Sequence, residues 1–97
     1  MKLVIVPPAL GELHDAAAFY TESANIELGL AFVAEFDRTV NVILANPTLG
    51  FIFRGNRRRY LLRRFPYSVI YQIGSDELRV IAVAHHRRRP GYWAGRK

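Results

Sequence analysis

The sequence contains no cysteine, so disulfides cannot stabilise the fold and cysteine usage says nothing about the redox compartment. Lysine is scarce as well, since Lys2 and Lys97 are the only two. No apolar run approaches the roughly 20 residues that a membrane-spanning helix requires. The apolar stretch at residues 3–6 is also too short for the core of a signal peptide. We therefore expect a cytoplasmic protein that does not interact with a membrane.

The rest of the composition is typical of a small globular protein. The chain has 97 residues, and 51% of them are hydrophobic, which favours a packed core over a disordered chain. A chain of this length buries about 60–70% of the surface that its unfolded form exposes. Neither an internal repeat nor a linker interrupts the sequence. We expect one domain over residues 1–97, with a basic C-terminal tail over residues 85–97.

The two halves of the chain differ strongly in charge. Residues 1–53 hold two basic and six acidic residues, a net charge of −4. Residues 54–97 hold twelve basic and two acidic residues, a net charge of +10, and together the halves give the +6 of the chain. Such an asymmetry predicts a polyanionic partner, either a nucleic acid or an acidic protein segment. The alternative is a surface that is merely well solvated.

The first half predicts a short strand followed by a helical hairpin. Residues 3–6 are apolar and precede two prolines, the second of which suits the first turn of a helix. The first helix shows apolar spacings of 3, 4 and 3 at Leu10, Leu13, Ala17 and Tyr20. The second helix is expected to begin after Asn25 as its N-cap, with Glu27 in the first turn, and to end at Asn46-Pro47. Its apolar stripe comprises Leu28, Phe32, Phe36, Val40, Ile43 and Leu44.

The second half predicts three strands, near residues 57–64, 67–73 and 78–85. Residues 74–76 have turn chemistry, and the apolar run at residues 80–84 indicates a central strand covered on both faces. The resulting order is β-α-α-β-β-β. We therefore expect an α+β fold in which the helical hairpin packs on a small, mostly antiparallel, four-stranded sheet.

An arginine cluster begins the second half: Arg54, Arg57, Arg58, Arg59, Arg63 and Arg64. On a strand, Arg57, Arg59 and Arg63 would share one face, and Arg58 and Arg64 the other. One face must touch the helices, so at least one group should lie on an exposed face. There, planar guanidinium groups bind phosphate or carboxylate through two parallel hydrogen bonds. The alternative is a solvated strand edge that charge protects against aggregation.

The tail sequence His85-His86-Arg87-Arg88-Arg89-Pro90-Gly91-Tyr92-Trp93 interleaves basic residues with large aromatic rings. This combination suits single-stranded nucleic acid. For Trp93 we favour the alternative that its ring packs the tail against the domain. The adjacent histidines would point to opposite faces of a strand, and no cysteine or nearby carboxylate completes a ligand set, so we expect neither a metal nor another cofactor.

Catalytic patterns are missing from the sequence. No serine stands beside a base in a recognisable pattern, and no phosphate-binding loop is present. No carboxylate lies between Asp37 and Asp76, which argues against a hydrolase that uses paired carboxylates on the basic sheet.

Two C-terminal motifs carry a family resemblance. Residues 60–71 (YLLRRFPYSVIY) and residues 80–93 (VIAVAHHRRRPGYW) resemble the corresponding motifs of ParE-type toxins. The N-terminal helices of that family are similar to Glu12-Leu13, residues 16–20, Leu28-Gly29 and Phe32 of this sequence. The resemblance implies a RelE/ParE-like fold and a plasmid-stabilisation toxin of a type II toxin–antitoxin system. It also implies a cognate antitoxin whose acidic, amphipathic C-terminal segment wraps the toxin beside the helical hairpin.

Within this superfamily, ParE-like members inhibit DNA gyrase, whereas RelE-like members cut mRNA on the ribosome. For a RelE-like nuclease, the resemblance assigns phosphate binding to Arg64 and proton transfer or charge stabilisation to His86 or Arg87. Tyr92 would correspond to the C-terminal aromatic residue of such a site. The lysines typical of RelE-like sites are missing, and arginine is a poor general base.

We therefore predict a ParE-like gyrase inhibitor without catalytic residues. The residues expected to bind the target or partner are Arg57, Arg59, Arg63, Arg64, Arg87, Arg88, Arg89 and Tyr92. Two alternatives stay open, namely an mRNA endonuclease and a small basic nucleic-acid-binding module.

Overall fold

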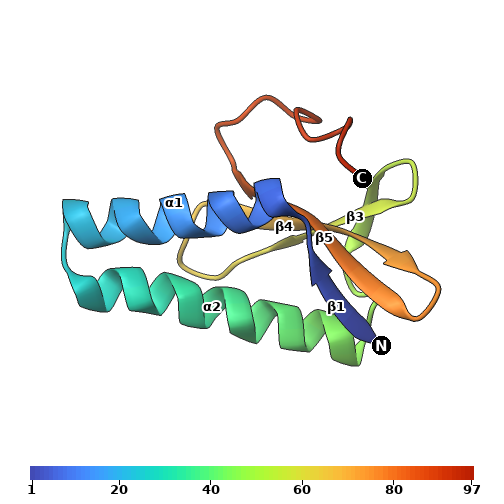
Figure 1. Ribbon diagram of the computed structural model, residues 1–97, viewed down its shortest axis with the longest axis horizontal. Coiled ribbons are helices and arrows are strands. Elements are labelled where there is room, and N and C mark those ends of the chain that lie inside the picture. Colours follow the sequence, from blue (N-terminus) through green and yellow to red (C-terminus); the bar gives the residue numbers. More distant parts are fainter.

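The computed structural model describes residues 1–97 as an α+β fold of two helices and a five-stranded sheet (Figure 1). The elements are β1 (Lys2–Ile5), α1 (Pro7–Ser23), α2 (Ile26–Ala45), β2 (Phe51–Arg54), β3 (Arg57–Leu61), β4 (Tyr67–Gly74) and β5 (Glu77–His85). The two helices run side by side as an antiparallel hairpin, and the tail after β5 folds back toward the sheet (Figure 1). Neither helix combines the length and apolar character that crossing a membrane requires.

The helical hairpin forms much as its periodicity predicts. The side chain of Asn25 caps α2 by accepting a hydrogen bond from the Leu28 backbone N–H at 2.8 Å, so the predicted N-cap is confirmed. The helices cross closely at Gly29, where an added Cβ would lie 2.0 Å from the Thr21 hydroxyl oxygen. α2 buries Phe32, Phe36, Val40 and Ile43 of the predicted stripe, and α1 buries Ala9, Leu13 and Ala16.

The sheet has the order β1-β5-β4-β3-β2, in which β1 is parallel to β5 and all other neighbours are antiparallel. The prediction of four strands is wrong because β2 forms an additional edge strand. Its pairing with β3 sets Phe51 opposite Arg59 and Ile52 opposite Arg58. Only three apolar residues precede Arg54-Gly55, and this run has no alternation that would mark a strand in the sequence.

The strand predicted at residues 57–64 ends earlier, at Leu61. Beyond it the chain turns, since the Leu62 N–H donates to the Tyr67 carbonyl and Arg64 has a φ of +70°. Arg63 and Arg64 therefore lie in the β3–β4 loop, and the prediction that they alternate with Arg57–Arg59 on one strand is wrong. The backbone N–H of Arg63 donates to the Glu35 carboxylate at 2.7 Å, which fixes this loop to α2.

The two faces of the sheet have different covers. β4 shows this directly, because the Tyr67 ring packs 5.0 Å from the Phe32 ring of α2, whereas its neighbour Ser68 contacts residues of the opposite face. Residues 80–84 of β5 are all buried between β1 and β4, as predicted for a central strand. The helical hairpin thus covers one face, and the C-terminal tail covers part of the other.

Candidate functional site

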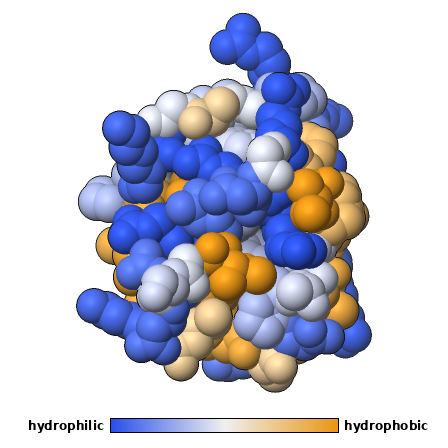
Figure 2. Space-filling model, turned by 90° about the vertical axis from the view of Figure 1, so that its right-hand side faces the viewer, coloured by the Kyte–Doolittle hydropathy of each residue, from blue (hydrophilic) through white to orange (hydrophobic).

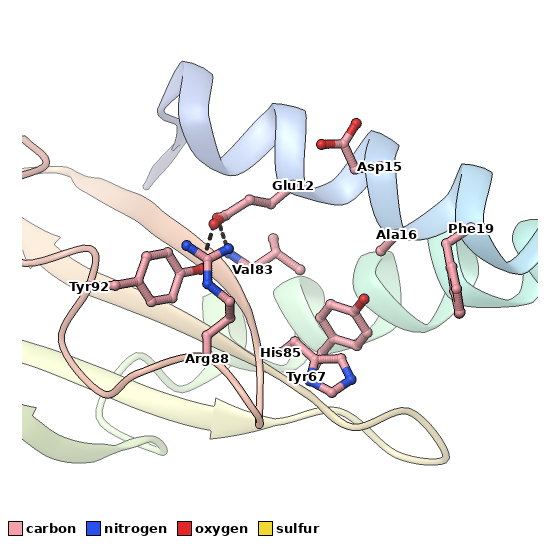
Figure 3. A pocket seen from close by; sticks show the side chains of 9 residues that line it. All are labelled: Glu12, Asp15, Ala16, Phe19, Tyr67, Val83, His85, Arg88 and Tyr92. Atoms are coloured by element: carbon pink, nitrogen blue, oxygen red, sulfur yellow. Dashed lines mark hydrogen bonds between the residues drawn. The ribbon is translucent and has the colours of Figure 1, made fainter.

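The carboxylate of Glu12 on α1 holds the C-terminal tail in place. It accepts a hydrogen bond from the Val83 backbone N–H at 3.0 Å and another from the Tyr92 hydroxyl (Figure 3). Arg96 donates to both carboxylate oxygens, at 2.8 and 3.2 Å. These donors occupy the acceptor capacity of the carboxylate. We call Glu12, Tyr92 and Arg96 the tail lock. Burial, followed by the bond to Glu12, raises the pKa of the Tyr92 hydroxyl.

Arg57 on β3 holds the last residues of the tail. Its guanidinium donates to the carbonyl oxygens of Trp93 at 3.1 Å and Ala94 at 3.2 Å, and also to the Arg96 carbonyl. Its Nε donates to the Gln72 side chain at 3.1 Å. Trp93 is only 2% exposed and lies 5.6 Å beneath this guanidinium, so the expected packing of Trp93 is confirmed. Most hydrogen-bond donors of the Arg57 side chain are therefore already bonded within the chain.

A small basic depression lies between the sheet and the tail, beside the tail lock. We call it the cationic hollow. It has a volume of about 60 Å³ and no carboxylate among its lining residues, which are Phe53, Arg59, Ile70, His85, His86, Arg88, Arg89, Pro90, Tyr92 and Trp93. Several basic side chains lie close together here without an acid, so an anion from outside would offset their mutual repulsion.

A hydrogen-bonded row crosses the floor of the hollow. Arg59 donates through Nε to the hydroxyl of Ser68 at 3.1 Å, and this oxygen lies 3.0 Å from Nε2 of His86. Because Ser68 accepts from Arg59, its own proton is available for a neutral imidazole. Burial and the nearby charge of Arg59 both lower the pKa of His86, which keeps the ring neutral near pH 7. Neither Nη nitrogen of Arg59 has an acceptor within the chain.

Aromatic rings hold two of these guanidinium groups in position. Arg88 lies 3.9 Å from the centre of the Tyr92 ring, and Arg59 lies 5.3 Å from that of Phe53. The guanidinium groups of Arg88 and Arg89 make no hydrogen bond within the chain, and both residues are exposed. Arg87 is exposed too, and its backbone N–H donates to Nδ1 of His85. These side chains retain donors for an acceptor from another molecule.

A larger groove lies between α1 and the tail on the other side of Tyr92 (Figure 3). We call it the α1 groove. Its volume is about 250 Å³, and its lining comprises Glu12, Asp15, Ala16, Phe19, Tyr67, Val83, His85, Arg88 and Tyr92. Phe19 is 58% exposed at this groove. The groove combines apolar side chains with charged side chains of both signs, and it shares His85, Arg88 and Tyr92 with the cationic hollow.

The three residues considered for a nuclease do not share one site. His86 and Tyr92 line the cationic hollow, whereas Arg64 lies on the β3–β4 loop, beside Glu35 and Arg38 of α2. A carboxylate does reach the basic sheet, contrary to the expectation from the sequence, because Glu12 arrives from α1. Its contacts with Tyr92 and Arg96 make it a structural group. No cluster of three histidine, aspartate or glutamate side chains that would hold a metal ion is present.

The end of the molecule that carries the strand hairpins and both termini is mainly polar. Figure 2 shows hydrophilic residues across the middle of this face, with apolar residues beside them. Several large apolar side chains near this end are well exposed, among them Phe51 at 54% and Ile52 at 62% on the edge strand β2. Neither residue stands out in the sequence, because no local pattern predicts β2 itself.

Comparison with known proteins agrees with this fold. A solved structure described as the chromosomal ParDE TA system from P. aeruginosa matches with a TM-score of 0.78. The match covers 88% of this chain and 95% of that chain at 20% sequence identity, a level that concerns the fold alone. A search of the curated proteins gave no match. The family model of the ParE toxin of the type II toxin–antitoxin system parDE matches residues 3–90. The chain therefore belongs to the ParE toxin family of type II toxin–antitoxin systems.

Proposed function

We propose that this protein inhibits DNA gyrase and that a cognate antitoxin neutralises it by direct binding. The observation that carries the proposal is the set of arginines with free donors on the tail face, chiefly Arg59, Arg88 and Arg89, on a surface whose hollow lacks a carboxylate. Such a surface is complementary to an acidic partner. Inhibition of gyrase is what the resemblance to ParE-like toxins implies. Both encounters would take place in the bacterial cytoplasm.

The antitoxin would occupy the α1 groove. The similar solved structure is described as a ParDE toxin–antitoxin system, which supports an antitoxin partner for this chain. An acidic amphipathic segment would place apolar side chains against Ala16 and Phe19 and carboxylates beside Arg88. The apolar surface of Ala16 and Phe19, next to the free guanidinium group of Arg88, suits such a segment better than it suits a small neutral ligand.

The contacts of Tyr92 favour a binding role over mRNA cleavage. Its hydroxyl donates to Glu12, and burial raises its pKa, so it is poorly placed to exchange a proton near pH 7. Arg64 lies away from the hollow, and an arginine rarely loses its proton. His86 alone could carry a proton, without an assembled set of partners.

Transcript mapping in bacteria shortly after inducing the protein distinguishes the two targets. We expect intact transcripts together with stalled replication and a DNA-damage response. Cuts inside translated reading frames, dependent on ongoing translation, would instead identify a nuclease and make Arg64, His86 and Tyr92 its active-site candidates. Normal growth after induction would contradict both readings.

The antitoxin site is tested by a pair of neighbouring substitutions on α1. Phe19→Glu places a negative charge in the α1 groove, whereas Ala18→Glu places the same charge on an exposed position that does not line it. We expect Phe19→Glu to abolish rescue by the co-expressed antitoxin while the variant remains toxic. Rescue should be intact for Ala18→Glu. Equal rescue of both variants would place the antitoxin elsewhere.

A further inference from the structure

An exposed aromatic ring stands directly beside the cationic hollow. Phe51 is paired with Arg59 across the β2–β3 ladder, so the two side chains lie on the same face with Cβ atoms roughly 5 Å apart. The ring of Phe51 is 54% exposed and meets Phe53 edge-on, with 6.3 Å between the ring centres. Phe53 in turn lies 6.0 Å from Trp93. A row of rings therefore runs from solvent to the buried floor of the hollow.

The row of rings and the free guanidinium groups together match one kind of ligand. The hollow, at about 60 Å³, admits a small anionic group and not a whole nucleotide. The planar donors of Arg59 fit the oxygens of a phosphate, and the exposed Phe51 offers a flat surface immediately beside it. Cations along a backbone and aromatic rings under the bases are the two features that single-stranded nucleic acid requires.

We propose that the cationic hollow and Phe51 form a binding site for single-stranded nucleic acid. A phosphodiester accepts hydrogen bonds from Arg59, Arg88 and Arg89, and the adjoining base stacks on Phe51. An acidic peptide fits this place less well, because the apolar wall that would anchor it lies across Tyr92, in the α1 groove. The site binds without cleaving, since the Tyr92 hydroxyl is bonded to Glu12. It uses the same arginines that the proposed function offers to an acidic partner, but oligonucleotide binding is measured separately from gyrase inhibition.

The first test measures the contribution of stacking. The full chain is titrated into a fluorescein-labelled oligothymidylate of about eight nucleotides, within the usual site size, and binding is followed by anisotropy. Phe51→Ala should raise the Kd about 5- to 100-fold, the loss expected for one stacked base. Ile52→Ala is the matched control, because Ile52 is the next residue on β2 and is also well exposed but points to the opposite face. It should change the Kd by less than about twofold.

The second test measures the phosphate contact. Arg59→Gln should reduce the slope of log Kd against log salt concentration by about 1, as expected for one lost phosphate contact. Arg63→Gln removes the same charge from the exposed β3–β4 loop, outside the hollow, and should leave the slope unchanged. Thermal unfolding of each variant ensures that a weaker affinity does not reflect a weaker fold.

Two results would overturn the proposal. Equal losses in Phe51→Ala and Ile52→Ala, or in Arg59→Gln and Arg63→Gln, would mean a diffuse basic surface without a site. A glutamate-rich peptide that displaces the oligonucleotide, and whose affinity falls in Arg59→Gln but not in Phe51→Ala, would assign the hollow to an acidic protein. Neither result bears on gyrase inhibition, which is measured by DNA supercoiling.

Discussion

Arg57 and Arg59 point from the same face of β3 toward the C-terminal tail, yet their surroundings differ. Above Arg57 the tail presents the backbone carbonyls of Trp93, Ala94 and Arg96, and the guanidinium binds all three. Above Arg59 lies the hydroxyl of Ser68, which takes only the Nε proton. A basic composition therefore does not identify binding residues by itself. The binding residues are instead the ones whose hydrogen-bond donors find no acceptor within the folded chain.

The same contrast separates the tail lock from the cationic hollow. In the tail lock, the Glu12 carboxylate compensates the charge of Arg96 and accepts from Tyr92. The hollow has no carboxylate among its lining residues, and its guanidinium groups form no ion pair. The polar residues of the tail lock thus fix the position of the tail, whereas the arginines of the hollow remain available to a partner.

The largest effect should come from breaking the tail lock. Glu12→Ala removes the acceptor of Tyr92, Val83 and Arg96 at once, and leaves a partly buried guanidinium unpaired. We expect a loss of about 3 kcal/mol in the free energy of unfolding, measured by urea denaturation. Asp15→Ala, one turn further along α1 on an exposed side chain, should stay within about 0.5 kcal/mol of the parent protein. Similar losses in both variants would mean that Glu12 does not hold the tail.

A direct comparison of the two arginines should give the next largest effect. Arg57→Ala leaves the tail carbonyls without their donor and should cost about 2 kcal/mol of stability. Arg59→Ala should cost less than about 1 kcal/mol, since it removes a single hydrogen bond within the chain. Denaturation curves of the two variants test this order. A larger loss for Arg59→Ala would refute the division into structural and available arginines.

Glu35 fixes the β3–β4 loop as Glu12 fixes the tail, and its effect should depend on pH. Hydrogen bonds from Arg38, and then from the Arg63 backbone, lower the pKa of Glu35 from 4.5 to about 2. Because the pKa is lower in the folded state, the stabilisation is present above pH 4.5 and is lost as the pH falls toward about 2.

Urea midpoints measured across this acid range test the prediction. The difference in stability between the parent protein and Glu35→Gln should shrink as the pH falls from 4.5 toward about 2. A difference that does not vary with pH would contradict the assigned pKa shift of Glu35.

The smallest effect concerns His86 in the hollow. Burial and the charge of Arg59 lower its pKa from 6.5, so removing that charge should raise the pKa again. We expect an upward shift in Arg59→Gln and none in Arg63→Gln, followed by NMR of the imidazole resonances. An unchanged pKa in Arg59→Gln would mean that Arg59 does not act on His86.

Local patterns predicted most of the fold. The periodicity of α2, its Asn25 cap and the apolar run of β5 are properties of adjacent residues, and all three were read correctly from the sequence. β2 escaped because an edge strand of four residues depends on its pairing with β3, which lies beyond any local pattern. The early end of β3 was missed for a similar reason, since a hydrogen bond to Tyr67 sets it.

The candidate site was less predictable than the fold. The sequence revealed a basic tail with aromatic residues, but it could not divide the arginines into structural and available groups. That division depends on contacts between distant segments, such as Glu12 with Val83 and Arg96, which are 71 and 84 residues apart. Phe51 was not predicted as a site residue, because its proposed role depends on its position opposite Arg59 in the folded sheet.

DNA supercoiling by purified gyrase, in the presence of the purified protein, tests the central functional claim most directly. We expect that supercoiling is lost, that cleaved DNA accumulates, and that adding the cognate antitoxin restores activity. Full supercoiling at a saturating concentration of a protein that still arrests growth would contradict it.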